Sequence, residues 1–160
     1  MPWHTPITVT TGQLITATNW NEQVRDNISY LKDIAYVEFT SNVSVTGTAF
    51  VDIVSSGAIT YAATPIAIEF YCFNITCGAS GILEIDIRDG ATDLGKLIDL
   101  NTSETIRAPF STRTLTPTAG SHTYTISAKN GVSQTSTVRA GAGGAGNPLP
   151  GFIRIRGIPS

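Results

Sequence analysis

Charged residues are scarce in this sequence. Lys, Arg, Asp and Glu together make up 14 % of the 160 residues, against roughly 25 % in a typical soluble domain. The net charge is −2 at pH 7, and the ten basic residues are scattered along the chain. Nucleic-acid binding needs clustered Lys and Arg, so we expect no nucleic acid among the partners. A polar, weakly charged composition suits a β-protein that hides part of its surface against other subunits.

Long hydrophobic runs are also missing. No apolar run approaches the roughly 18 to 20 residues that cross a bilayer, so we expect no membrane insertion. Residues 1–6 lack both the basic region and the apolar region of a signal peptide. We therefore expect a protein that is made in a cytosol and assembled there into something larger.

Cysteine and histidine are too few for most site chemistries. His122 is the only histidine of the predicted β-domain, and no Gly-x-Ser-x-Gly elbow occurs, which argues against a Ser-His-acid hydrolase. Cys72 and Cys77, with His4 and His122 far away in the sequence, lack the spacing of a zinc site. We expect two buried free thiols, with a disulfide across a bend as the alternative.

Other patterns that resemble functional sites have simpler explanations. Glu84 and Asp86 share a strand face by parity and could flank a ligand, but solvent-facing alternation gives the same pattern. Residues 86–93 lack the regular acidic series of a calcium loop and predict a turn. The glycine-rich residues 140–148 lack the Gly-Lys-Ser/Thr of a P-loop and predict a surface loop. We therefore expect no catalytic residue, no metal, no cofactor and no enzymatic activity.

The N-terminal part predicts an arm followed by a helix. Pro2, Pro6 and Gly12 interrupt a Thr-rich stretch, so residues 1–15 should be extended. Asn19, followed by Glu22 at capping-box spacing, and Thr16 are possible caps. We expect the helix to run from about residue 17 to about 34.

The apolar residues of this predicted helix form a seam. They are Val24, Ile28, Leu31 and Ala35, at the a/d spacing of a coiled coil, with Trp20 and Ile34 beside them. An isolated helix of this length is marginal in water, so the seam must pack on something. One alternative is the chain's own β-domain. The other is self-association around a symmetry axis or docking onto a larger assembly, which the arm's inability to fold alone favours.

From residue 36 onward the hydrophobic pattern has period two. Residues 66–73 form a more continuous apolar run, which predicts a central strand buried on both faces. The expected strands are residues 36–40, 43–46, 50–54, 58–61, 66–73 and 82–88, then about 95–100, 105–115, 122–129, 134–140 and 152–158. Short strands at this spacing predict a mainly β protein, an antiparallel β-sandwich or jelly roll over residues 36–160, preceded by an arm and one α-helix over residues 1–35.

Two stretches carry a resemblance to a known group of proteins. The first is Pro2-Trp3 followed by Gly12-x-x-Ile15-Thr16-Ala17-x-x-Trp20-Asn21-x-x-Val24-Arg25-Asp26-Asn27-Ile28-x-Tyr30-Leu31. It resembles the N-terminal signature of small tailed-bacteriophage virion proteins, in which an arm precedes a Thr-Ala-x-x-Leu-Asn-x-x-Val-Arg-Asp-Asn helix; Trp20 stands where an aliphatic residue is common. Residues 116–124, the Gly/Ala loop and residues 150–155 are similar to the β-domains of such proteins.

The resemblance implies both a fold and a role. Similar proteins are capsid decoration proteins, head fibres, and tail-fibre or tail-tip subunits, commonly homotrimers with a jelly-roll or tumour-necrosis-factor-like β-domain. We expect a homotrimeric capsid decoration or head-spike protein of the virion, assembled in the bacterial cytoplasm and bound to other virion proteins through residues 1–35. The expected attachment and oligomerisation residues are Trp3, Trp20, Val24, Ile28, Leu31 and Ala35. The alternative is a tail receptor-binding subunit that recognises a host surface glycan or protein.

Overall fold

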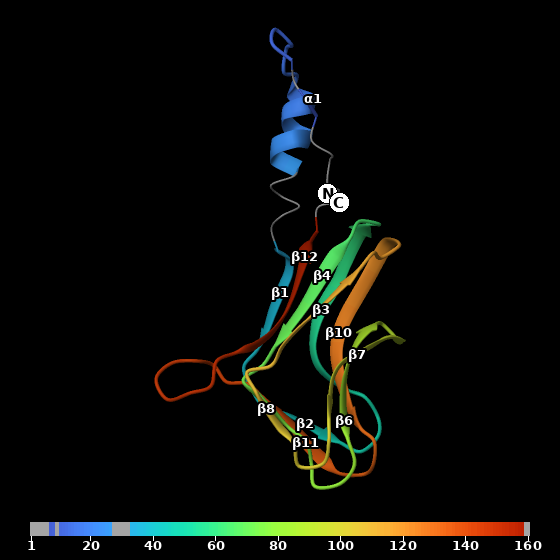
Figure 1. Ribbon diagram of the computed structural model, residues 1–160, viewed down its shortest axis with the longest axis vertical. Helices are drawn as coiled ribbons and strands as arrows, with labels where there is room; N and C mark the ends of the chain where they lie inside the picture. The colour runs from blue at the N-terminus through green and yellow to red at the C-terminus, as the bar shows by residue number, and fades with distance from the viewer. Residues whose placement is uncertain (1–6, 9, 27–32, 159–160) are drawn as a thin grey trace.

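The computed structural model describes residues 7–8, 10–26 and 33–158 as a short N-terminal helical segment and a β-body (Figure 1). The helical segment consists of α1 (Ala17–Trp20) and a π-helical turn, η1 (Asn21–Asp26). The strands of the β-body are β1 (Asp33–Phe39), β2 (Val43–Thr46), β3 (Val51–Ala62), β4 (Ile66–Tyr71), β5 (Asn74–Thr76), β6 (Leu83–Asp89), β7 (Thr92–Leu100), β8 (Thr105–Arg107), β9 (Phe110–Leu115), β10 (Ala119–Asn130), β11 (Thr135–Arg139) and β12 (Gly151–Gly157). None of the described helices has the length and hydropathy to span a bilayer.

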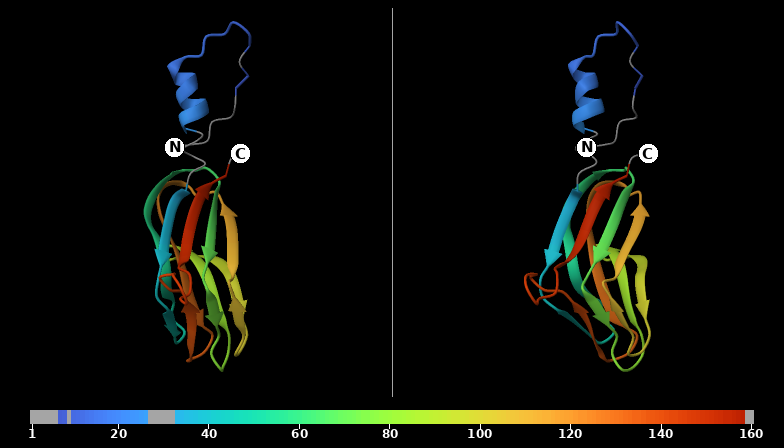
Figure 2. Two further views of the ribbon diagram at one scale, coloured as in Figure 1. Left: turned by 90° about the vertical axis from the view of Figure 1, so that its left-hand side faces the viewer. Right: turned by 60° about the vertical axis from the view of Figure 1, so that its left-hand side comes forward.

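The strands form three antiparallel sheets. Sheet A has the order β1-β12-β4-β9, sheet B the order β2-β11-β5-β8, and sheet C the order β3-β10-β6-β7. Each strand of sheet B continues a strand of sheet A in the same order, so the two sheets form successive parts of one layer. The long strands β3 and β10 of sheet C cover that layer; Figure 1 shows the two layers edge-on, and in the left view of Figure 2 sheet A faces the viewer. The predicted antiparallel β-sandwich is confirmed, while its finer assignment to a jelly roll stays a prediction.

One core joins the layers. Strand alternation turns the apolar residues of each strand inward, and residues from all three sheets meet in a single buried cluster. Its largest fully buried members are Ile66, Ile68, Phe70, Ile75, Leu83, Ile85, Ile87, Leu100, Tyr124, Ile126, Ile153 and Ile155. Strand β4 lies between β12 and β9 and is buried on both faces, as its continuous apolar run predicted.

The strand predictions need several corrections in the β-body. The strand expected at about 105–115 is two strands, β8 and β9, which lie in different sheets, and β5 was not predicted. Residues 50–54 and 58–61 were expected to be two strands, but they belong to the single strand β3. Gly57 has a φ of +71° in its middle, and the pairing of β3 with β10 shifts register there. A bulge of this kind bends a strand without ending it, so glycine marks an irregularity here and not a turn.

The predicted helix is too long. Thr16 does cap α1, because its Oγ1 accepts a hydrogen bond from the backbone N–H of Asn19 at 3.2 Å. However, strand β1 begins at Asp33, so Ala35 lies in a strand, paired with Ile155 and half-buried against the core. The assignment of Ala35 to a helical seam is therefore wrong. Ala35 extends the alternation of residues 36–39, and its pairing with Ile155 of β12 holds it in the strand.

Candidate functional site

The N-terminal segment exposes large apolar side chains. Leu14 is 82 % exposed, Trp20 57 % and Ile15 56 %. The backbone N–H of Ile7 donates to Oε1 of Gln23 at 3.2 Å, which ties the arm to the helical turn. Between them lies a hollow of about 160 Å³, lined by Ile7, Ile15, Asn19, Trp20, Gln23 and Val24.

This apolar surface is not covered by the β-body. In Figures 1 and 2 the helical segment lies beyond one end of the sandwich, and α1 packs on η1. Of the predicted attachment residues, Trp20 and Val24 lie on this surface and Ala35 lies in β1. Trp3, Ile28 and Leu31 lie outside the described residues. The arrangement favours docking on another molecule over packing on the chain's own β-domain.

The outer face of sheet A carries a second exposed apolar surface, which we call the aromatic row. It consists of Phe152 (β12), Tyr71 (β4) and Phe110 (β9), which are register neighbours, together with Tyr36 (β1). The Phe152 ring centroid lies 5.6 Å from that of Tyr71 and 5.3 Å from that of Tyr36. Phe110 is 55 % exposed and Tyr36 48 %. Four aromatic rings in one exposed row are more than an isolated surface residue and indicate a contact surface.

An arginine cluster borders the aromatic row. The Glu69 carboxylate on β4 is buried; it accepts a hydrogen bond from Nε of Arg154 at 2.7 Å and forms an ion pair with Nη2 of Arg156 at 2.8 Å. The Arg154 guanidinium lies 6.0 Å from the Phe152 ring centroid. Aromatic residues and arginine are the types enriched in protein interfaces, so this face has the composition of a subunit contact.

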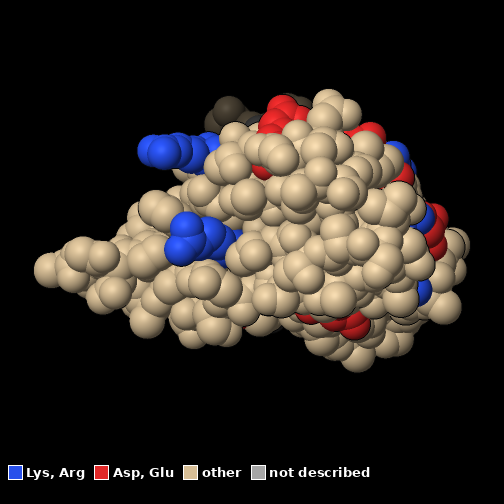
Figure 3. Space-filling model, turned by 90° about the horizontal axis from the view of Figure 1, so that it is seen from below, with Lys and Arg blue, Asp and Glu red and all other residues tan. Residues whose placement is uncertain are grey.

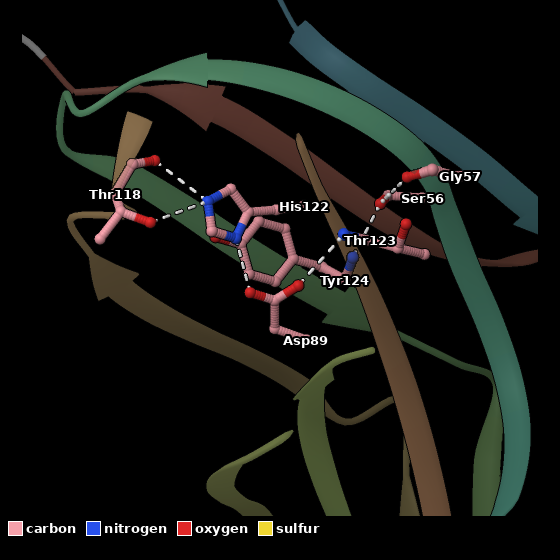
Figure 4. Close-up of polar contacts among 7 residues, drawn as sticks. All are labelled: Ser56, Gly57, Asp89, Thr118, His122, Thr123 and Tyr124. Carbon is pink, nitrogen blue, oxygen red and sulfur yellow. Dashed lines mark hydrogen bonds and ion pairs between the residues drawn. The ribbon is translucent and has the colours of Figure 1, made fainter. Parts of the chain in front are cut away.

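His122 lies at the start of β10 in a compact polar cluster (Figure 4). Its Nδ1 is 2.6 Å from Oδ2 of Asp89 at the end of β6, and its Nε2 is 3.0 Å from the carbonyl oxygen of Thr118. With Asp89 ionised, both partners are acceptors, and the two contacts favour the form of His122 in which both ring nitrogens donate, the imidazolium. The hydrogen bond to Asp89 raises the pKa of His122 against the opposing effect of burial, and the Thr118 carbonyl adds to the rise.

The cluster joins two parts of the chain. Oδ1 of Asp89 accepts a hydrogen bond from the backbone N–H of Thr123 at 3.2 Å, and the His122 ring stacks on Tyr124 with centroids 5.9 Å apart. Nε2 of His122 also lies 3.4 Å from the hydroxyl oxygen Oγ1 of Thr118, a longer contact than the one it makes with the Thr118 carbonyl oxygen. These contacts connect the segment before β10 to the end of β6.

The predicted carboxylate pair is not assembled as a site. Glu84 forms ion pairs with Lys96 at 2.9 Å and Lys129 at 3.3 Å, and the hydrogen bond from Lys96 is the main cause of its lowered pKa. Asp86 is 1 % exposed, its Oδ1 has no hydrogen-bond partner, and burial raises its pKa. Within residues 7–8, 10–26 and 33–158, no group of three or more His, Cys, Asp or Glu could hold a metal ion.

The two cysteines are as predicted. Cys72 and Cys77 are buried free thiols, and burial raises the pKa of Cys72 to about 12. A thiol with so high a pKa is not a nucleophile at neutral pH.

A pocket of about 290 Å³ beside His122 could not be predicted from the sequence. Its lining includes Asp89, Leu94, Arg113, Leu115 and Tyr124. These residues come from β6, β7, β9 and β10, so only the tertiary structure brings them together. Asp89 and His122 are likewise 33 positions apart in the sequence, so no local pattern predicts their contact.

The end of the β-body farthest from the helical segment is mostly uncharged. Figure 3 shows it as a surface of uncharged residues with few basic or acidic side chains. The view agrees with the low fraction of charged residues in the whole chain.

Comparison with protein-family models and with curated proteins finds no match to this chain. The functional conclusions therefore rest on its own residues and geometry.

Proposed function

We propose that the protein is a structural subunit of a tailed-bacteriophage virion, a homotrimeric capsid decoration or head-spike protein. It attaches through its N-terminal segment and displays the β-body, without chemistry. The observation that carries the proposal is the exposed apolar surface of residues 7–24, which does not pack on the β-body. The resemblance of residues 2–31 supplies the virion context.

The strand order supports the fold expected for such a subunit. Strands β1, β4, β9 and β12 of sheet A, with sheet B continuing them, form one layer, and β3, β6, β7 and β10 of sheet C form the other, so the chain crosses repeatedly between layers. Repeated crossing between two antiparallel layers is also a feature of a jelly roll.

The aromatic row supports self-association. We assign to it the contact between β-bodies of neighbouring subunits, because aromatic and arginine side chains are concentrated there. Phe110 is the row's most exposed member, so it contributes the largest apolar area on contact. The trimer would thus be held at two places, the helical segment and sheet A.

The first experiment measures oligomeric mass by light scattering of the full chain. We expect three times the 16.9 kDa of one chain. Leu14→Ser should weaken the assembly at least tenfold, because it removes a large exposed apolar side chain from the N-terminal surface. Leu149→Ser is the matched control, since Leu149 is also exposed, at 58 %, but lies on the β-body. A wild-type chain that stays monomeric at all concentrations contradicts the trimer.

The second experiment locates the protein on the particle. Immunogold labelling of virions should mark the head. Labelling at the tail tip would instead support the alternative role, a receptor-binding tail subunit, which the pocket beside His122 favours. Virions that carry no label at either place contradict both.

A further inference from the structure

The pocket lies at the open side of the sandwich, where two edge strands face each other. Strand β9 is the last strand of sheet A and β7 the last strand of sheet C. Leu94 of β7 and Arg113 and Leu115 of β9 line the pocket, and residues 116–118, Asp89, His122 and Tyr124 complete it. Figure 4 shows the wall formed by His122, Asp89 and Tyr124. The volume of about 290 Å³ is at the lower end of the range for small-molecule sites.

Arg113 is an unusual member of this lining. In β9 the residues Thr112 and Thr114 are exposed and Arg113 is half-buried, so its side chain turns toward the interior of the sandwich. No described residue forms a hydrogen bond or an ion pair with its guanidinium. A guanidinium carries five N–H donors, and those of Arg113 remain open to solvent or a ligand, since none of its nitrogens is among the fully buried atoms without a partner.

The opposite strand makes room for this guanidinium. A Cβ added to Gly95 of β7 would lie 2.8 Å from Nη1 of Arg113. Gly95 also has a φ of +117°, in the region that favours glycine. The backbone at Gly95 therefore permits the charged end of Arg113 to lie against β7, at the mouth of the pocket.

The other charges of the pocket are already paired. Oδ2 of Asp89 binds the His122 imidazolium, and Oδ1 accepts the Thr123 N–H. One cationic group thus remains with its donors open, the Arg113 guanidinium. Beside it are the apolar surfaces of Leu94, Leu115 and Pro117.

We propose that this pocket binds a small monocarboxylate, with the carboxylate on Arg113 and the carbon body against Leu94 and Leu115. A planar guanidinium matches a carboxylate through two parallel hydrogen bonds, which gives strength and orientation together. A single open cation suits a singly charged anion better than a phosphate dianion. This site is independent of the attachment surface, so the proposal does not rest on the virion role.

Titration calorimetry of the full-length protein tests the proposal with two acids and their neutral counterparts. The probes are benzoate against benzamide, and glucuronate against glucose. We expect at least one acid to bind saturably and at least tenfold more tightly than its neutral counterpart. The proposal is supported if the binding of either acid depends on Arg113. The acid that binds more tightly shows whether the pocket prefers an aromatic or a sugar carbon body. Equal affinity of acid and neutral probe, or no saturable binding of either acid, overturns it.

Substitutions of Arg113 test whether its guanidinium binds the carboxylate of the acid probes. Arg113→Gln should weaken acid binding at least tenfold. Arg113→Lys should weaken it less, because lysine keeps the positive charge but lacks the two parallel N–H donors of the guanidinium. Arg107→Gln is the matched control, since Arg107 is an exposed arginine of β8 outside this pocket. Unchanged binding in Arg113→Gln overturns the proposal. If Arg113→Gln does not fold, the proposal is tested by comparing the affinities of the wild-type protein for each acid and its neutral counterpart.

Discussion

Replacing Asp89 with Asn should destabilise the protein in a pH-dependent way. The substitution keeps the size of the side chain and removes the negative charge that faces the His122 imidazolium at 2.6 Å. Both side chains are well shielded, with 15 % of His122 and 25 % of Asp89 exposed. A hydrogen bond between charged groups contributes about 1.5–3 kcal/mol, so we expect a loss of about 2 kcal/mol at pH 5.5.

The sign of the pH dependence follows from the raised pKa of His122. In the unfolded chain a histidine titrates near about 6.5. A group whose folded pKa lies above that value stabilises the fold fully below it, and this contribution disappears as the pH rises through the folded pKa. The difference between wild type and Asp89→Asn should therefore narrow to about 1 kcal/mol or less by pH 9, where only a neutral hydrogen bond is at stake.

Urea unfolding at pH 5.5, 7 and 9 measures this difference. The matched control is Asp99→Asn, because Asp99 is 52 % exposed and pairs with Lys96 at 3.2 Å on the surface. A surface pair contributes about 0–1 kcal/mol, with no change over the histidine range. An NMR titration of the His122 ring gives its pKa directly. A stability difference that is the same at pH 5.5 and pH 9, or a His122 pKa of 6.5 or lower, refutes the imidazolium assignment.

Three further substitutions test the β-body by urea unfolding. Asp86→Asn should stabilise the protein by about 1 kcal/mol at pH 7, because Asp86 is buried with an unpartnered oxygen; since its folded pKa is raised, the gain should vanish as the pH falls below about 4. Gly151→Ala should cost about 1–3 kcal/mol, because the new Cβ overlaps the Phe39 ring, and Phe39→Leu in the same chain should recover part of the loss. Ile126→Ala should cost about 2–5 kcal/mol, since Ile126 is fully buried; a cost below 1 kcal/mol contradicts the single core.

Most of the sandwich could be predicted from the sequence because strand alternation is a local signal. Residues 43–46 alternate cleanly and form β2 over the same range. The continuous apolar run of residues 66–73, which is also a local signal, predicted the buried strand β4, observed over Ile66–Tyr71. Gly57 misled the prediction, since a glycine that ends a strand and one that forms a bulge look alike in sequence.

The helix boundary shows where local patterns become ambiguous. Ala35 stands four residues after Leu31, as a helical seam requires, and one residue before the alternating stretch that begins at Tyr36. Pairing with Ile155, 120 residues later in the chain by their numbering, decides in favour of the strand. A long-range contact of this kind leaves no local signal.

The candidate site residues also differ in whether a local sequence pattern could predict them. Trp20 was predicted as an attachment residue because it stands beside the apolar seam of a capped helix, and the structure leaves it 57 % exposed. Arg113 was not, because alternation between Thr112 and Thr114 does not say which face of an edge strand is inside. The guanidinium of Arg113 lies against Gly95 of β7. This contact forms only because β7 and β9 face each other across the open side of the sandwich.

The position of β12 has a consequence for folding. This strand lies between β1 and β4 in sheet A, although both precede it by far in the chain. Sheet A therefore cannot close until residues 151–157 have left the ribosome. Until then β1 and β4 have unpaired edges, which are sites of aggregation. Contacts this distant in sequence also slow folding, typically to milliseconds or seconds. Completion of the chain, and not its early β-strands, should thus be the step that commits the protein to its native state.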